Sequence, residues 1–144
     1  MRDLEMETGR QLLKWLGEIE EMQNYKMMIL RTVGACEESA TVIGSYVDIL
    51  IAEFKKGKPT ADDIEALREL NQTHGRILIA VVHVRVELEK IYESTSKWMK
   101  LSRQERDQRK VSMWATMDKA LEIAEDARQL HEGGERLERI VREW

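Results

Sequence analysis

Apolar residues between positions 67 and 98 recur at alternating steps of three and four residues, which is the spacing of a coiled-coil heptad. Residues three and four apart lie on the same side of a helix, so these positions form one continuous seam. The pattern predicts a helix over residues 61–99, packed lengthwise against neighbouring helices, with Gly75 as the point where it could kink. The seam consists of Leu67, Leu70, His74, Ile77, Val81, Val84, Leu88, Ile91, Thr95 and Trp98.

A β-strand is the competing interpretation for part of this segment. The run from Val82 to Glu89 alternates strictly between apolar and polar residues, which is typical of a strand. We favour the helix because the heptad continues well beyond this run on both sides. A strand here would also have only residues 41–54 as a pairing partner.

The first part of the chain predicts two helices, over residues 3–33 and 37–56. In the first, apolar residues recur at helical spacing and most charged residues lie off that stripe. The second is apolar on more than one side, which is typical of a helix buried in its own fold or in an assembly. Gly34 could end the first helix, because only glycine enters the left-handed conformation without steric cost. Neither proline nor a Ser/Gly cluster separates the two segments, so one continuous helix is the alternative.

The later boundaries carry clearer signals. Residues 55–59 combine lysines, glycine and proline, and these residues end a helix. Residues 60–63 and 102–105 each resemble a capping box, which begins a helix. The later helices are therefore expected over 103–132 and, after Gly133 and Gly134, over 135–143.

These elements predict a single all-α domain over residues 1–144, and a chain of this length can bury a core without metals or disulfides. We expect an up-down bundle of four main helices. If the first two segments are fused, the alternative is three very long helices in a coiled-coil hairpin. The apolar face of the 103–132 helix is expected at Met113, Trp114, Met117, Ala120, Leu121, Ala124, Ala127 and Leu130.

Composition narrows the class of protein. The net charge of −4 lacks the global basic character that nucleic-acid-binding proteins usually show. The most apolar window, residues 77–86, contains His83 and Arg85 and is too short and too polar for a transmembrane span. The single cysteine cannot form an intramolecular disulfide, and the first ten residues lack the apolar region of a signal peptide. Together these features predict a cytoplasmic protein without a membrane segment.

No motif for catalysis or metal binding is apparent. A di-iron bundle needs Glu-x-x-His, and none of the three histidines has glutamate three positions before it. Cys36 is followed by two acidic residues, which disfavour the reactive thiolate. The chain also lacks Gly-x-Ser-x-Gly, Walker and dinucleotide-type glycine motifs. We therefore predict no catalytic residue, no metal site and no cofactor, and keep an enzyme with a motif-free pocket between helices as a second alternative function.

The first alternative function rests on a local stretch of basic residues. Six basic residues against two acidic ones give residues 97–110 a charge of +4, and Trp98 and Trp114 flank the basic residues from 103 to 110. Such a stripe can track phosphates, so a nucleic-acid-contacting subunit is the alternative, although a solvated helix start explains the charges more simply. The basic residues are Lys97, Lys100, Arg103, Arg106, Arg109 and Lys110.

The leading hypothesis for the function rests on large flexible and aromatic side chains. They surround the first helix too widely for one core stripe, and a tryptophan ends an amphipathic stripe at the C-terminus. We therefore expect a non-enzymatic interaction protein that binds through its helices, either to itself as a homo-oligomer or as a small subunit or adaptor of a larger assembly. The expected partner-binding residues are Trp15, Met22, Tyr25, Met27, Met28 and Trp144.

Overall fold

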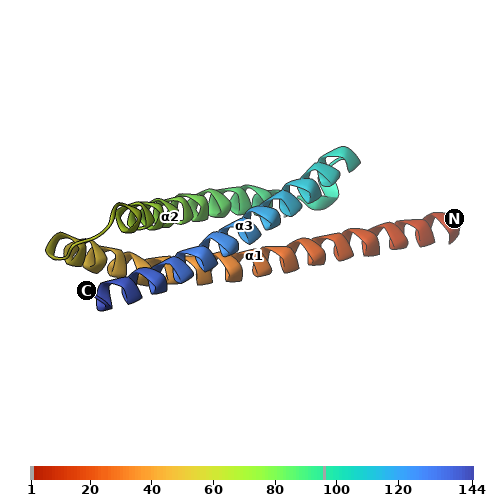
Figure 1. Cartoon of the computed structure of the whole chain (residues 1–144). Helices are drawn as coiled ribbons and strands as arrows, with labels where there is room; N and C mark the ends of the chain where they lie inside the picture. The colour runs from red at the N-terminus through yellow and green to blue at the C-terminus, as the bar shows by residue number, and fades with distance from the viewer. Residues whose placement is uncertain (1, 96) are drawn as a thin grey trace.

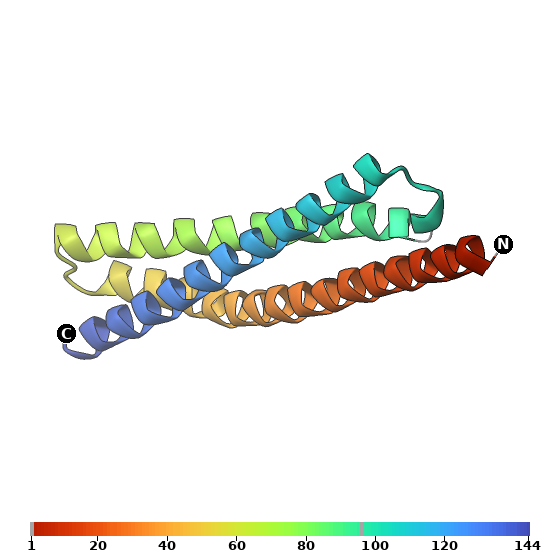
Figure 2. The same cartoon turned by 90° about the vertical axis from the view of Figure 1, so that its right-hand side faces the viewer.

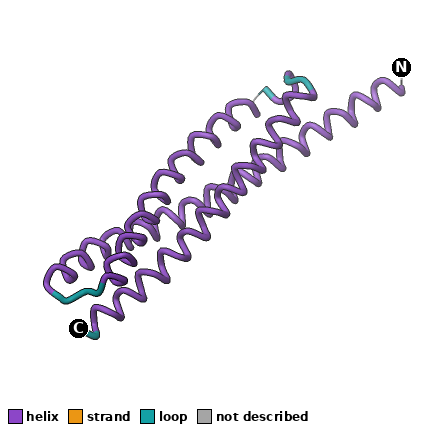
Figure 3. Tube along the Cα trace, turned by 45° about the horizontal axis from the view of Figure 1, so that its top comes forward, coloured by secondary structure: helices purple, strands orange, loops and turns teal. Residues whose placement is uncertain are grey.

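Three long helices and one short 3-10 helix make up this all-α chain (Figure 1). The structure is a computed structural model that describes residues 2–95 and 97–144, with side chains from residue 6 to 91 and from 97 onward. Each long helix contacts the other two, and the described residues contain no strand (Figure 3). In that part of the chain, no helix is apolar over a stretch long enough to cross a membrane. The elements are α1 (Arg2–Lys56), α2 (Ala61–Thr95), η1 (Trp98–Lys100) and α3 (Arg103–Arg142).

α1 is one unbroken helix of 55 residues, so the prediction of separate helices over 3–33 and 37–56 is wrong and the continuous alternative is right. Gly34 stays helical, and no glycine in the described residues has a positive φ. A glycine inside a helix costs about 1 kcal/mol relative to alanine, and tertiary packing on both sides of Gly34 outweighs that cost. The bundle therefore has three long helices rather than four, with α1 and α3 running parallel and α2 antiparallel to both (Figure 2).

α3 is also continuous, so the predicted break between 132 and 135 is wrong. Gly133 instead permits a close approach, because a methyl group at this position would come within 3.1 Å of Cδ1 of Leu70. The heptad segment is helical as predicted, passes through Gly75, and ends at Thr95 rather than at residue 99. The strand alternative for residues 82–89 is therefore wrong.

Capping side chains define both predicted helix starts. Thr60 Oγ1 accepts a hydrogen bond from the Asp63 backbone N–H at 3.1 Å, and the Asp63 carboxylate accepts one from the Thr60 backbone N–H at 3.0 Å. Ser102 Oγ accepts from the Glu105 backbone N–H at 3.1 Å. Each cap satisfies amide groups that lack a partner inside the helix, so α2 and α3 begin where the sequence predicts.

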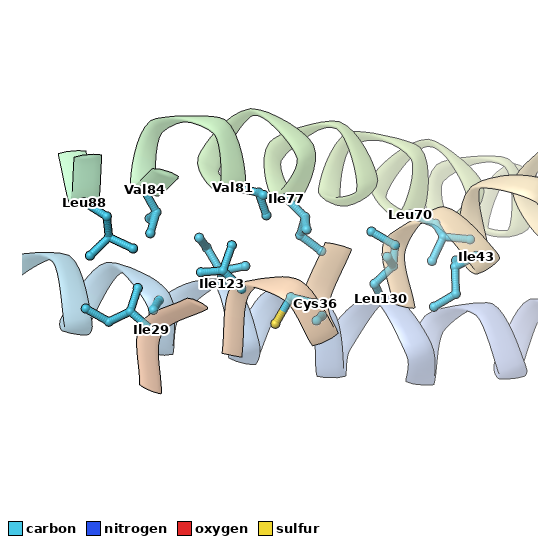
Figure 4. Packing of buried hydrophobic residues seen from close by; sticks show 14 of the residues in the cluster. Ile29, Cys36, Ile43, Leu70, Ile77, Val81, Val84, Leu88, Ile123 and Leu130 are labelled. Atoms are coloured by element: carbon cyan, nitrogen blue, oxygen red, sulfur yellow. The ribbon is translucent and has the colours of Figure 1, made fainter. Parts of the chain in front are cut away.

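The core is a seam between α1, α2 and α3 (Figure 4). Seven of the ten predicted seam residues of α2 are buried, Leu67 and His74 are half-buried, and the side chain of Thr95 lies outside the described part. His74 fits because it lies against Gly44, where a methyl group would come within 2.6 Å of its Nε2. α1 meets this seam with the same recurrence of threes and fours, through Met22, Ile29, Val33, Cys36, Ala40, Ile43, Val47, Leu50 and Phe54.

The core face of α3 differs in part from the predicted one. Trp114 and Leu121 were expected in the core but are 49% and 57% exposed. Thr116 and Ile123, which were not expected there, are buried. The helix is rotated so that its buried residues are Met113, Thr116, Ala120, Ile123, Ala127, Leu130 and Leu137.

The parallel helices α1 and α3 are held in one register by contacts near both ends. Lys110 Nζ lies 3.4 Å from the Glu18 carboxylate, and Tyr46 donates to the Glu138 carboxylate at 3.4 Å. Both contacts join residues 92 apart, so the two helices keep the same relative position along this length. The N-terminal end of α1 extends beyond the other helices, and Leu12, Leu13 and Leu16 are exposed on it (Figure 2).

Candidate protein-interaction surface

The predicted partner-binding residues do not form one surface. Met22 is only 3% exposed and packs inside the bundle, so it has no surface to offer a partner. Met27 and Met28 are about half exposed, at 51% and 55%, and Tyr25 is half-buried beside the core. These three residues lie on the outside of α1 and remain candidates for contact with another molecule.

The two predicted tryptophan anchors have partners within the chain. Trp15 is half-buried, and the guanidinium carbon of Arg106 lies 5.3 Å from the centre of its ring, which is a cation–π contact. Trp144 packs on Phe54 with ring centroids 5.1 Å apart. It also covers Gly57, where a methyl group would come within 2.3 Å of its ring. Intramolecular packing therefore explains much of what the sequence pattern assigned to an external partner.

Half of the predicted basic patch takes part in contacts within the bundle. Arg106 donates to the backbone carbonyl of Leu101 in addition to its contact with Trp15. Lys110 pairs with Glu18, and Arg109 is half-buried on the same helix. Of the six predicted basic residues, Lys97, Lys100 and Arg103 are exposed. These three residues alone are free to form the continuous stripe of charge that a phosphate backbone would need.

A second apolar stripe runs along the outside of α1, and we call it the outer stripe. Its members recur at alternating steps of three and four, like the core seam, but lie on a neighbouring side of the helix. Met28, Val42 and Ile49 are 55%, 60% and 56% exposed, and no helix within the described residues covers them. The outer stripe consists of Tyr25, Met28, Thr32, Ala35, Ser39, Val42, Tyr46 and Ile49.

α3 extends this apolar surface sideways. Because Tyr46 of the outer stripe meets Glu138, the stripe borders the side of α3 that carries Lys110, Met117, Ala124, His131 and Glu138 at steps of seven residues. Met117 and Ala124 are half-buried against the core. The exposed Trp114 and Leu121 each lie three residues before one of them and hence on the adjacent side of the same helix. The outer stripe with Trp114, Met117, Leu121 and Ala124 is the α1–α3 face.

Most of the α1–α3 face was not predicted as one surface, although the sequence contains a signal for it. Met28, Ala35, Val42 and Ile49 follow each other at intervals of seven residues, which indicates a stripe along one helix. Ending the first helix at residue 33 split this series between two expected helices. Its continuity became visible only with the continuous α1.

A groove of about 730 Å³ lies between α2 and α3, on another side of the bundle. Ile79, Ala80 and Ile123 contribute apolar surface, and charged residues of both signs surround them. Thr116 Oγ1 donates to the carbonyl oxygen of Ser112 at 2.7 Å, so the groove's two hydroxyl-bearing residues are linked to each other. Within the described residues, no three His, Cys, Asp or Glu side chains are grouped to hold a metal ion.

Cys36 lies in the core, 6% exposed, and not in this groove (Figure 4). Burial raises the pKa of its thiol, which leaves less of the reactive thiolate at neutral pH. The folded chain holds this proton to higher pH than the unfolded chain does. Ionisation of Cys36 therefore lowers stability only at alkaline pH.

Labelling of Cys36 by a thiol-reactive disulfide should be slow in the native protein. Because the sulfur is reached only when the helices separate locally, we expect a rate at least about 100-fold below that of the unfolded chain. The measurement is the release of the chromogenic thiol at neutral pH, with the same reaction in urea as the control. Rapid stoichiometric labelling of the native chain would contradict the buried position of this residue.

A comparison of the chain with known protein families, with curated proteins and with solved structures found no match.

Proposed function

We propose that this protein is a non-enzymatic interaction protein whose α1–α3 face binds an α-helix of another protein molecule. The observation that carries the proposal is the outer stripe, a second heptad seam on a helix whose first seam is already filled by α2 and α3. Heptad-spaced apolar residues pack against a neighbouring helix by inserting side chains between those of the partner. The described helices already fill the first seam with one another, which supports a helix of another molecule as the partner of the second.

The size and character of the face support this function. Exposed apolar residues on a monomer are normally scattered, whereas a contiguous patch marks a site of association. Here Met28, Val42 and Ile49 follow one side of α1, and Trp114 and Leu121 lie beside them on α3. Tryptophan and other large side chains at the centre of a face supply much of the binding energy in protein interfaces. An interface of this kind needs no cofactor.

The compartment belongs to the same proposal. The single cysteine is a free, buried thiol. Free cysteines are typical of reducing compartments, where disulfides do not persist. This supports a role in the cytoplasm, as a homo-oligomer or as a small helical subunit of a larger assembly.

A pair of matched substitutions tests the proposal. Val42→Glu places a charge in the outer stripe, whereas Val82→Glu places the same charge on α2, and both valines are 60% exposed. Desolvating an unpaired carboxylate in an interface is costly, so Val42→Glu should weaken association by roughly 10-fold or more. Val82→Glu should bind like the wild type. Sedimentation of the purified chain and capture from its native source give the measurements. At low protein concentration, where association adds little to the apparent stability, thermal unfolding should be nearly unchanged in both variants.

Two results would refute the proposed function. One is a wild-type chain that stays monomeric and captures no protein. The other is association that survives Val42→Glu as well as it survives Val82→Glu, since the α1–α3 face would then be the wrong surface.

A further inference from the structure

We propose that the helix bound by the α1–α3 face is α1 of a second copy of this chain, lying antiparallel to the first about a two-fold axis. This inference rests on the proposed function and names its partner. A two-fold interface uses the same surface on both copies, so the surface must be complementary to itself. The outer stripe and its flanking charges meet this condition.

Charge complementarity sets the direction of the two helices. Arg31 and Glu38 lie seven residues apart on the edge of the outer stripe away from α3, and both are exposed. Neither takes part in an ion pair within the described part of the chain. In an antiparallel pair, Arg31 of each copy faces Glu38 of the other, which makes two equivalent ion pairs. A parallel pair has its two-fold axis along the helices, which puts the two Arg31/Glu38 edges on opposite sides of the interface, so these ion pairs could not form.

The same alignment matches the sizes of the apolar residues. With Arg31 opposite Glu38, the axis passes near Thr32 and Ala35, whose small side chains allow the two backbones to approach closely. Met28 then lies opposite Ser39 of the other copy, and Val42 lies opposite Tyr25. Each larger residue thus packs into a hole made by residues of the facing helix, as in antiparallel coiled coils.

The area available is that of a small specific interface. Because Tyr25 of each copy lies opposite Val42 of the other, the two outer stripes overlap from Tyr25 to Val42, which is roughly 26 Å at about 1.5 Å per residue. With two adjacent helices roughly 20 Å wide, the overlap offers on the order of 500 Å² per copy, against the ~800 Å² per partner of a typical specific complex. Trp114 and Leu121 add apolar surface beside the second copy's α1.

Charge reversal tests the proposal. Arg31→Glu alone sets glutamate against glutamate twice, and Glu38→Arg alone sets arginine against arginine twice. Each single variant should weaken the dimer by about tenfold, because two surface pairs change from attraction to repulsion. The double variant Arg31→Glu/Glu38→Arg restores both pairs in the antiparallel dimer and should return to nearly the wild-type dissociation constant. Sedimentation equilibrium over a concentration series at low salt gives the constants.

Asp48→Arg is the matched control, because Asp48 is an exposed acid of α1 that lies away from the outer stripe. This variant should dimerise with the dissociation constant of the wild type. Failure of the double variant to recover would overturn the antiparallel arrangement. A wild-type chain that stays monomeric would refute the proposal that the partner is a second copy of this chain. If that monomer still captures another protein in a Val42-dependent way, the dimer alone fails; if it captures none, the proposed function fails as well.

Discussion

Replacing Trp98 with alanine should lower the free energy of unfolding by about 3–5 kcal/mol, the range for truncating a buried large aromatic side chain. Trp98 is 1% exposed and anchors η1 between α2 and α3. Its Nε1 donates to the Glu18 carboxylate at 3.1 Å, so the substitution creates a cavity and also removes a donor from a partly buried acid. A domain of this size is stable by only about 5–15 kcal/mol, so the loss should be plain in urea denaturation followed by circular dichroism.

Trp114→Ala is the matched control, because Trp114 is 49% exposed on α3. Its free energy of unfolding should change by less than about 1 kcal/mol, as for surface substitutions. Both variants should be measured at the same low protein concentration, where association adds little to the apparent stability. Equal losses in the two variants would show that Trp98 is not the buried anchor described above.

Ile123→Ala should lower the free energy of unfolding by about 2–5 kcal/mol, since Ile123 is 2% exposed and the cavity opens between three helices (Figure 4). Leu121→Ala removes a similar side chain two residues away, where the leucine is 57% exposed, and should change stability by no more than about 0.5 kcal/mol at low concentration. The pair measures which side of α3 faces the core. A larger loss of stability from Leu121→Ala than from Ile123→Ala would contradict the orientation of α3 seen in the structure.

The seam of α2 could be predicted from the sequence because one strong heptad covers nearly its whole length. α3 shows why the same reasoning failed elsewhere. Trp114, Met117, Leu121 and Ala124 also follow steps of three and four, so α3 carries two apolar stripes side by side. The stripe with the tryptophan draws attention by the size of its side chains, whereas the buried one includes the smaller Thr116 and Ala120. Only the positions of the other helices decide which stripe is buried.

The continuity of α1 depends on a small energy difference that local sequence does not reveal. One glycine changes helix stability by about 1 kcal/mol, which is less than the packing of a single large core residue contributes. The outer stripe was therefore divided at Gly34 and its repeat overlooked. Trp144 appeared to lack a partner for a similar reason, since Phe54 becomes its neighbour only when α1 and α3 lie parallel.

The 92-residue separation of the contacts between α1 and α3 bears on how the chain folds. Closing a loop costs entropy that grows with its length, so these contacts are unfavourable until the intervening chain is ordered. The two hairpins, α1 with α2 and α2 with α3, need only short connections of a few residues. A hairpin should therefore form first, and the parallel pairing of the outer two helices should be the late step that completes the core.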